Sequence, residues 1–226
     1  MSARPFVTSV LFAALVGVFA PEAAAQATRP PVKIPPLAPD VALRPFFLST
    51  AQRMAASDTF EAIFGSPVQP FWGGGAQLTM SNGFFVEGTI SRFSKTGERA
   101  FVLDGEASSL GIPLDASIVP IEATAGYRFG ADFSNTVTPY FGAGFASYKY
   151  TESSEFDDPG DAVSERGNGF LVVGGAEVRV HKWMTVSADV QYTQIGGVLG
   201  DGGLSKDLGE DNLGGIAARF RIIIGR

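Results

Sequence analysis

The sequence lacks cysteine altogether and contains a single histidine, His181. Without cysteine the chain has no disulfide bond, no thiolate nucleophile and no cysteine to carry a lipid anchor. One histidine also leaves too few nitrogen and sulfur ligands for a typical zinc or other transition-metal site, so we expect no metal and no cofactor. The formal net charge of −6 further argues against a nucleic-acid partner, because domains that bind nucleic acid are basic.

No apolar run reaches the ~20 residues that a membrane-spanning helix needs. The longest apolar stretch, Pro5–Ala20, follows Arg4 and precedes small residues that offer cleavage sites after Ala25 or Ala27. A positive start, an apolar stretch and a small-residue cleavage site together are typical of a secretory signal peptide. We therefore interpret residues 1–27 as a signal peptide that is removed on export.

Proline is concentrated in the segment that follows. Thr28–Val41 holds five prolines in fourteen residues, and no later segment has this composition. Such a segment is extended and builds no core of its own. The sequence therefore predicts a Pro-rich periplasmic tether at residues 28–42 and a single domain at residues 43–226.

Within that domain, long stretches of helical periodicity are missing and period-two alternation recurs instead. The alternation predicts eight strands: Leu43–Arg53, Trp72–Met80, Phe84–Arg92, Val119–Phe129, Thr136–Tyr150, Phe170–Val180, Met184–Tyr192 and Ile216–Ile224.

The predicted connections alternate in length. Tight links occur at Ser81–Gly83, where Asn-Gly favours a type I′ turn, and at His181–Lys182, and Gly130–Asn135 is a short link. The long links span about residues 54–70, 94–113, 152–166 and 197–211. An even strand number, with short turns at one end and long loops at the other, is typical of an all-β fold, the eight-stranded antiparallel up-and-down transmembrane β-barrel. Both termini would then lie at the periplasmic, short-turn end.

The alternation alone leaves open whether the apolar faces point into a soluble core or outward to lipid. In the five strands with the clearest alternation, the polar faces hold no lysine and balance four acids against four arginines. These eight residues are Glu87, Glu122, Arg128, Glu177, Arg179, Asp189, Arg219 and Arg221. Because charges removed from water must be paired, and arginine pairs carboxylates with a two-pronged fork, we expect them to form a charge network inside the barrel.

The apolar faces fit a membrane as well. The stripe Met184–Tyr192 is close to the ~9–11 residues of a tilted spanning strand. Aromatic residues lie toward the ends of the stripes, as at bilayer interfaces: Trp72 and Tyr192 at one end, Phe84, Tyr127 and Phe129 at the other. The facing of Thr136–Tyr150 stays open, because Tyr140 and Phe141 compete for the lipid side.

Three segments carry a resemblance to the small eight-stranded outer-membrane β-barrels of the OmpA transmembrane-domain and OmpW-like type. They are VTPYFGAGFASYKY (Val137–Tyr150), GGAEVRVHKWMTVSADVQYT (Gly174–Thr193) and the final GGIAARFRIIIGR (Gly214–Arg226). The resemblance implies a monomer in the bacterial outer membrane, in contact with outer-membrane lipid, lipopolysaccharide and the barrel insertion machinery. Members of that class usually end in an aromatic residue, whereas this chain ends in Arg226.

Three functions follow from these features. Side chains fill the interior of an eight-stranded barrel, so the leading expectation is a closed barrel in a structural or surface-interaction role. The OmpW-like resemblance allows a second function, the passage of small or hydrophobic molecules. A lipid-modifying enzyme comes third, because such enzymes use histidine with serine, and the immediate neighbours of His181 include no serine. We expect no catalytic residue.

The long links raise two further possibilities. Residues 152–166 carry six acids and residues 197–211 carry four, and clustered carboxylates bind Ca²⁺ or Mg²⁺. Neither link has the spacing of an EF-hand loop, so we expect solvated acidic surfaces instead. Asp58 and Glu61 resemble a capping box that starts a short helix, which runs through Phe64, ends at Gly65 and has an apolar side suited to covering the barrel mouth.

Overall fold

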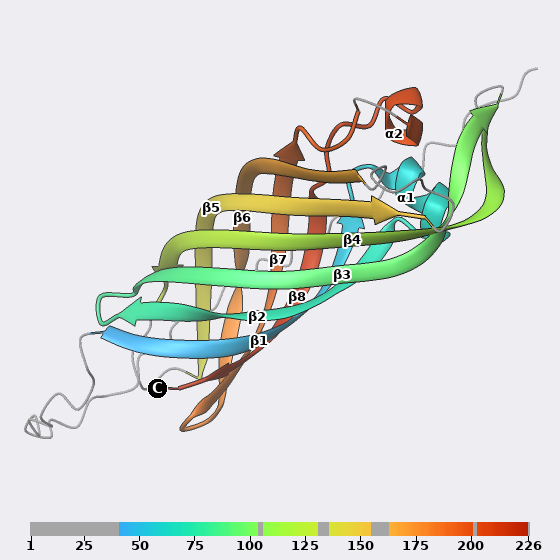
Figure 1. The fold of residues 1–226 in the computed structure, drawn as a ribbon. Coiled ribbons are helices and arrows are strands. Elements are labelled where there is room, and N and C mark those ends of the chain that lie inside the picture. Colours follow the sequence, from blue (N-terminus) through green and yellow to red (C-terminus); the bar gives the residue numbers. More distant parts are fainter. Residues whose placement is uncertain (1–40, 104–105, 131–135, 155–162, 201–202, 226) are drawn as a thin grey trace, which may run out of the picture. The chain divides into compact units, whose positions relative to one another are not determined.

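The computed structural model describes residues 41–103, 106–130, 136–154, 163–200 and 203–225. Eight strands form a closed antiparallel barrel in which each strand pairs with its neighbours in sequence and the last pairs with the first (Figure 1). They are β1 (Val41–Met54), β2 (Val68–Met80), β3 (Phe84–Leu103), β4 (Glu106–Arg128), β5 (Val137–Ser153), β6 (Val163–His181), β7 (Met184–Gly196) and β8 (Gly215–Ile224). The predicted eight-stranded up-and-down barrel is confirmed.

Two short helices lie in the connections at the long-loop end. Helix α1 (Ser57–Phe64) connects β1 to β2, and helix α2 (Gly203–Asp207) connects β7 to β8. Of the helices in the described part of the chain, neither has the length and apolar character needed to cross a membrane.

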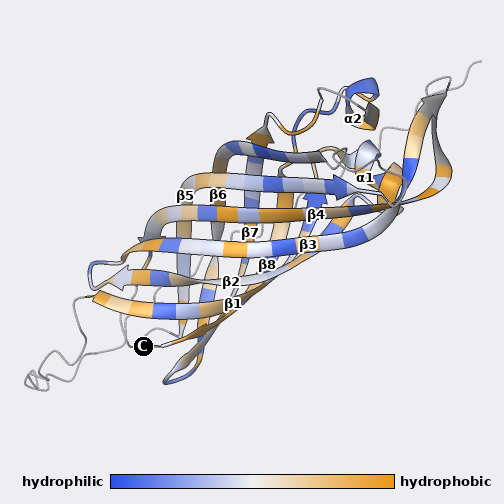
Figure 2. Ribbon diagram, in the orientation of Figure 1, coloured by the Kyte–Doolittle hydropathy of each residue, from blue (hydrophilic) through white to orange (hydrophobic). Residues whose placement is uncertain are grey.

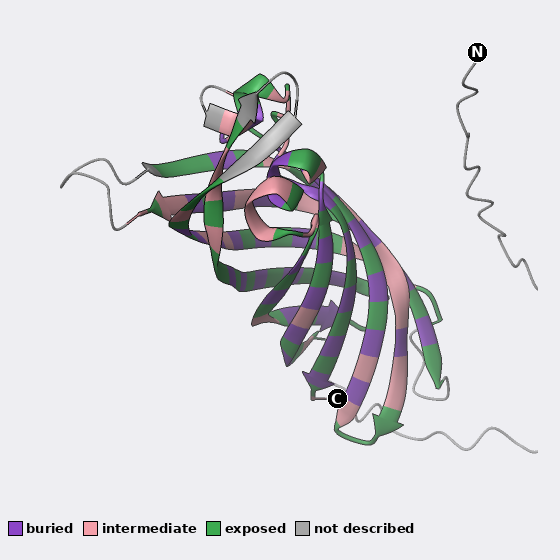
Figure 3. Ribbon diagram, turned by 90° about the vertical axis from the view of Figure 1, so that its right-hand side faces the viewer, coloured by how far each residue is buried: buried purple, intermediate pink, exposed green. Residues whose placement is uncertain are grey.

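Burial alternates along the strands, with exposed and buried residues in turn (Figure 3). On β7 the apolar Val190 is 58% exposed, whereas the neighbouring Asp189 is only 6% exposed. The polar face therefore points inward and the apolar face outward, the reverse of a soluble barrel, so both kinds of residue recur along each strand (Figure 2). On β5, Tyr140 is buried inside and Phe141 is 55% exposed outside, which settles the facing that the sequence left open.

Strands extend into two predicted loops. The sequence predicts a long link at residues 94–113, but β3 runs to Leu103 and β4 starts at Glu106, so the two strands continue as a paired ribbon beyond the barrel wall (Figure 1). Likewise β5 continues to Ser153 and β6 starts at Val163, within the predicted link 152–166. Beyond the membrane both faces of a ribbon meet water, so the sequence there does not need the alternation that reveals a half-buried strand.

The short turns differ from prediction only in detail. Between β2 and β3, the Gly83 N–H donates to the Met80 carbonyl at 3.0 Å. Gly83 follows with φ of 92°, and the connection consists of the three residues predicted for it, Ser81–Gly83. His181 is the last residue of β6 rather than a turn residue, and it follows a β-bulge after Arg179.

The N-terminal boundary also shifts slightly. Strand β1 begins at Val41, so the last two residues of the predicted tether, 41 and 42, already belong to the barrel. They pair with Met80 and Thr79 of β2. The predicted signal peptide and the rest of the tether lie outside the described residues.

Gly83 gives a first test of the fold. A Cβ added there would lie 2.8 Å from the Arg128 carbonyl oxygen, on a backbone that already has positive φ. We expect Gly83→Ala to lower the free energy of unfolding by about 1–2 kcal/mol, the usual cost of a left-handed L-residue. The measurement is a urea titration in detergent micelles, with folded and unfolded barrel separated by electrophoretic mobility. Gly88→Ala is the matched control, because nothing lies within 4 Å of a Cβ there, and an equal loss in both variants would contradict the assignment.

Candidate functional site: the barrel interior

Two arginines of β8 stand at the centre of the barrel interior. Arg221 pairs with Glu87 of β3 at 2.5 Å and with Asp189 of β7 at 3.3 Å. Arg219 pairs with the same Asp189 at 2.6 Å and with Glu122 of β4 at 3.4 Å. All five side chains are at most 6% exposed, so these charges interact with one another and not with bulk water.

Neutral side chains complete the hydrogen bonding of the carboxylates. Glu122 accepts hydrogen bonds from the Gln191 amide at 2.9 Å and the Tyr148 hydroxyl at 3.2 Å. The Tyr140 hydroxyl donates to Asp189 at 2.5 Å, and the Gln77 amide donates to Glu87 at 3.0 Å. Buried polar networks stabilise a fold only when their members are satisfied, and these carboxylates are.

A second group of charges lies toward the short-turn end. Glu177 of β6 pairs with Arg44 of β1 and with Arg128 of β4, each at 2.9 Å. Arg44 also donates to the Gln77 side chain at 2.9 Å, which links this group to the central one through Glu87. The side chain of Arg128 is 12% exposed, more than any other member, as expected next to the barrel mouth.

The eight charged residues predicted from the sequence differ in burial and in ion pairing. Six are buried and joined by ion pairs within the two groups: Glu87, Glu122, Glu177, Asp189, Arg219 and Arg221. Arg128 is half-buried and joins them through Glu177. Arg179 is half-buried two residues beyond Glu177, at the end of β6.

Arg44 is the charged member that sequence reasoning missed. It is 3% exposed, but its inward neighbours along β1 are Phe46 and Leu48, which are buried as well. Because these two apolar residues point inward, the sequence alternation of β1 does not show which of its faces lines the interior. Tyr140, Tyr148, Gln77 and Gln191 were missed for another reason: uncharged polar residues carry no pairing requirement that could single them out.

Most buried side chains toward the long-loop end are apolar, although Gln52 and Gln69 are buried there as well. These apolar side chains belong to one cluster from seven strands and α1, in which Phe60 of α1 is 2% exposed and which also extends to Phe85 and Tyr140 toward the short-turn end. The other large members include Met54, Phe71, Phe93, Ile118, Leu171, Ile195 and Leu213. Since α1 inserts Phe60 among strand residues, the helix covers the barrel from this end, as the sequence suggested for its apolar side.

Helix α1 is held by a residue far away in the sequence. The carboxylate of Glu210, from the connection between β7 and β8, accepts hydrogen bonds from the backbone N–H groups of Asp58 at 3.0 Å and Thr59 at 2.8 Å. The predicted capping box is therefore wrong: α1 has Ala56 at its N-cap without a side-chain hydrogen bond, and Glu210 takes that role. The predicted end at Gly65 is confirmed, with the left-handed φ of 73°.

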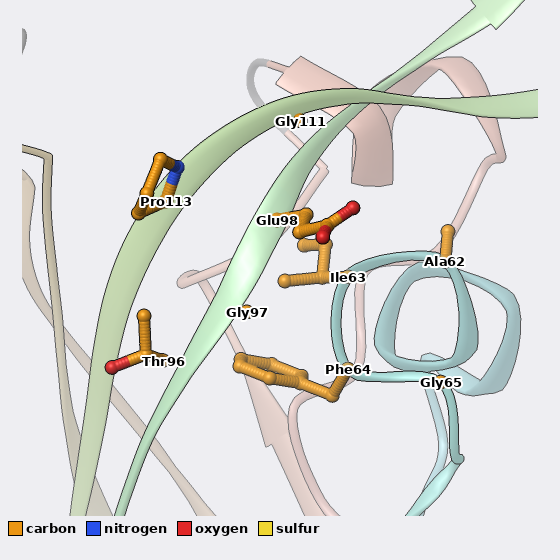
Figure 4. A pocket seen from close by; sticks show the side chains of 9 residues that line it. All are labelled: Ala62, Ile63, Phe64, Gly65, Thr96, Gly97, Glu98, Gly111 and Pro113. Atoms are coloured by element: carbon orange, nitrogen blue, oxygen red, sulfur yellow. The ribbon is translucent and has the colours of Figure 1, made fainter.

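The other side of α1 packs on the β3–β4 ribbon. Ile63 and Phe64 point from the helix toward β3 at Gly97 (Figure 4). A Cβ on Gly97 would lie 2.7 Å from Ile63 Cγ2 and 2.8 Å from Phe64 Cδ1, so glycine permits this close approach. A groove of about 560 Å³ remains beside the contact, lined also by Thr96, Glu98 and Pro113.

Catalytic and metal-binding arrangements gain no support from the described residues. His181 is exposed and packs edge-on against Trp183, with ring centroids 5.1 Å apart. Within the described ranges, no group of three or more His, Asp or Glu side chains is arranged to hold a metal ion. Residues 155–162 and 201–202 of the acidic loops lie outside those ranges.

The central arginines give the second test. We expect Arg221→Gln to lower the free energy of unfolding by about 3–5 kcal/mol, because it leaves Glu87 buried without its charge partner. Arg53→Gln, an exposed arginine on the outer face of β1, is the control and should cost less than about 0.5 kcal/mol. The same urea titration in micelles measures both. Equal stability of Arg221→Gln and the parent protein would show that the buried pairs do not support the barrel.

The chain is similar to several solved structures at low sequence identity. Neisserial surface protein A is 14% identical, with 83% of this chain and 98% of that chain covered and a TM-score of 0.50. A major outer membrane protein from Thermus thermophilus is 11% identical, with 81% and 99% covered and a TM-score of 0.48. The N-terminal β-barrel domain of Pseudomonas aeruginosa OprF is 11% identical, with 81% and 97% covered and a TM-score of 0.45. The curated proteins contain no match to the chain.

A family model matches most of the sequence. The outer membrane protein beta-barrel domain matches residues 10–214, which include seven of the eight strands. The apolar outer face, the charged interior and the closed sheet of eight strands agree with that match. The chain therefore belongs to the outer membrane protein beta-barrel family, whose members lie in the bacterial outer membrane.

Proposed function

We propose that this protein is a closed outer-membrane barrel with a structural or surface-interaction role, and that its long-loop end faces the cell exterior. The observation that carries the proposal is the filling of the interior by two layers in series. The charged layer around Arg219 and Arg221 is followed, toward the long-loop end, by the apolar cluster around Phe60. An ion would have to break buried salt bridges and then cross an apolar layer.

The proposed orientation rests on the lengths of the connections. Outer-membrane barrels have short periplasmic turns and longer extracellular loops. Here α1, α2 and the β3–β4 ribbon all lie at one end, and the connections β2–β3 and β6–β7 lie at the other (Figure 1). The N-terminal tether and the C-terminus would then be periplasmic, and the elements at the long-loop end would be the surface that meets partners.

The proposed partners follow from the outer surface. Exposed apolar side chains such as Phe47, Phe141, Phe145 and Val190 suit outer-membrane lipid. A closed barrel has no free strand edge within the membrane wall, which supports a monomer. On β8, Phe220, Ile222 and Ile224 point outward and are available to the barrel insertion machinery.

The two other functions have weaker support. Passage of small or hydrophobic molecules needs a continuous route, and both interior layers lie across it. A lipid-modifying enzyme needs an activated nucleophile, and the exposed His181 has an aromatic ring as its neighbour. The closed barrel is therefore the function that the geometry supports best.

Conductance gives the test of this proposal. We expect purified protein in a planar lipid bilayer to show no stable conducting level. The layers lie in series, so disrupting one should leave the other as a barrier. We therefore expect the single variant Phe60→Ala and the double variant Glu87→Ala, Arg221→Ala both to remain non-conducting. Heat-denatured protein serves as the control for non-specific leakage. Uniform, repeated conductance steps from the folded parent protein would contradict the closed barrel and favour a passage function.

A further inference from the structure

Basic residues on the outer face of the barrel are distributed unevenly. Arg53 of β1, Arg92 of β3, Lys149 of β5 and Arg166 of β6 are all exposed, point outward and lie toward the long-loop end. Toward the short-turn end, the described outward positions of the eight strands carry no Asp, Glu, Lys or Arg. The outer wall therefore offers positive charge to only one leaflet of the membrane.

Three of these residues lie in one row across the sheet. Lys149 is directly opposite Arg166 on β6 and opposite Val119 on β4. Arg92 falls between the pairs Ile90–Ile121 and Phe93–Ile118, which places it level with Val119. Since neighbouring strands are ~4.8 Å apart, Arg92, Lys149 and Arg166 form a basic row about 15 Å wide across β3–β6.

The positive charges of the basic row are close together and lack a counter-charge in the described part of the chain. Like charges directly opposite on neighbouring strands destabilise a sheet, and Lys149 and Arg166 are such a pair. Arg166 donates to the Ser147 hydroxyl at 3.4 Å, but among the described residues no ion pair involves any of the three cations of the row. An external anion would satisfy them.

Outward rows toward both ends of the wall indicate what kind of anion this is. Directly next to the basic row on the short-turn side is a mixed row, Ile90, Ile121, Ser147 and Asn168, and the row beyond it is Gly88, Ala123, Phe145 and Phe170, in which Phe145 is 78% exposed. Two residues toward the long-loop end, a distance of ~7 Å, the outward row consists entirely of hydroxyl residues. These are Ser94, Ser117, Thr151 and Ser164, each opposite the next.

We propose that this wall of β3–β6 binds the phosphorylated sugar headgroup of a glycolipid in the outer leaflet. The apolar row contacts the acyl chains, the basic row pairs with the phosphates and the hydroxyl row hydrogen-bonds the sugar. A phospholipid headgroup matches less well, because its phosphate carries no sugar ring to occupy four hydroxyls. The inference rests on the proposed orientation, which puts the long-loop end in the outer leaflet.

Native mass spectrometry of the purified, folded protein in detergent tests the site. The probes are bis-phosphorylated lipid A, dephosphorylated lipid A and phosphatidylglycerol. We expect the parent protein to bind the bis-phosphorylated form most tightly. The triple variant Arg92→Gln, Lys149→Gln and Arg166→Gln should weaken this binding about 100-fold, because each cation contributes roughly 1 kcal/mol and about 1.4 kcal/mol corresponds to a tenfold change in affinity. Arg53→Gln is the matched control, because Arg53 is also outward but its cross-strand neighbours are Val68 and Ile216.

Each part of the proposal has its own contradicting result. Unchanged binding in the triple variant, or equal binding of dephosphorylated lipid A, would overturn the basic row as a phosphate site. Equal binding of phosphatidylglycerol would overturn the choice of a glycolipid. If the triple variant does not fold, as judged by electrophoretic mobility, Lys149→Gln alone should still weaken binding about fivefold.

Binding is measured on purified protein and does not depend on conductance, so a conducting barrel with an intact site would overturn only the closed-barrel proposal. Labelling of Lys206→Cys from outside intact cells tests the orientation separately, because Lys206 is exposed on α2 at the long-loop end.

Discussion

The closed barrel is built around the ion pairs of Arg219 and Arg221 with Glu87, Glu122 and Asp189. A barrel whose outer face meets lipid must turn its polar residues inward, where each charge has lost its water. Such charges are tolerated only with partners and complete hydrogen bonding, since an unpaired buried charge is strongly destabilising. The arginines come from β8, whereas their partners come from β3, β4 and β7, so pairing requires that the barrel be closed.

The interior changes its chemistry along the barrel axis. Buried charges are concentrated in the central region and around Glu177, beside a small apolar cluster of Phe46, Leu48 and Ile223, whereas apolar side chains such as Phe60 dominate the long-loop region. Helix α1, which supplies Phe60, is held in turn by Glu210 from a connection about 150 residues further along the chain. The cap on the barrel thus depends on the closed sheet, which brings the β1–β2 and β7–β8 connections together.

The sequence predicts the structure correctly where side chains face lipid or where charged groups are buried away from water. Period-two alternation revealed the eight strands, and the requirement for charge pairing singled out Glu87, Asp189 and Arg221. Outside the membrane neither constraint acts, which is why the sequence predicts a loop where the β3–β4 ribbon lies. Arg44 was hidden by the inward Phe46 and Leu48, and the Glu210 contact could not be found because it joins two loops whose proximity only the closed sheet creates.

Charges on the outer wall need counter-charges as well. Its cations do not face the carboxylates of the interior, and Arg92, Lys149 and Arg166 lie where the apolar belt gives way to hydroxyl residues. In this account the membrane supplies the counter-charge for the outer wall, whereas the protein supplies its own inside.

Whether the interior is packed and dry can be measured directly, because the chain has no native cysteine. Ser187→Cys and Gln191→Cys place single thiols beside the central arginines, and Lys182→Cys places one at an exposed turn. With a water-soluble maleimide, we expect rapid labelling of Lys182→Cys and no labelling of the two interior thiols until the barrel is unfolded in urea. Rapid labelling of Ser187→Cys or Gln191→Cys in the folded protein would show that the interior is hydrated and not packed.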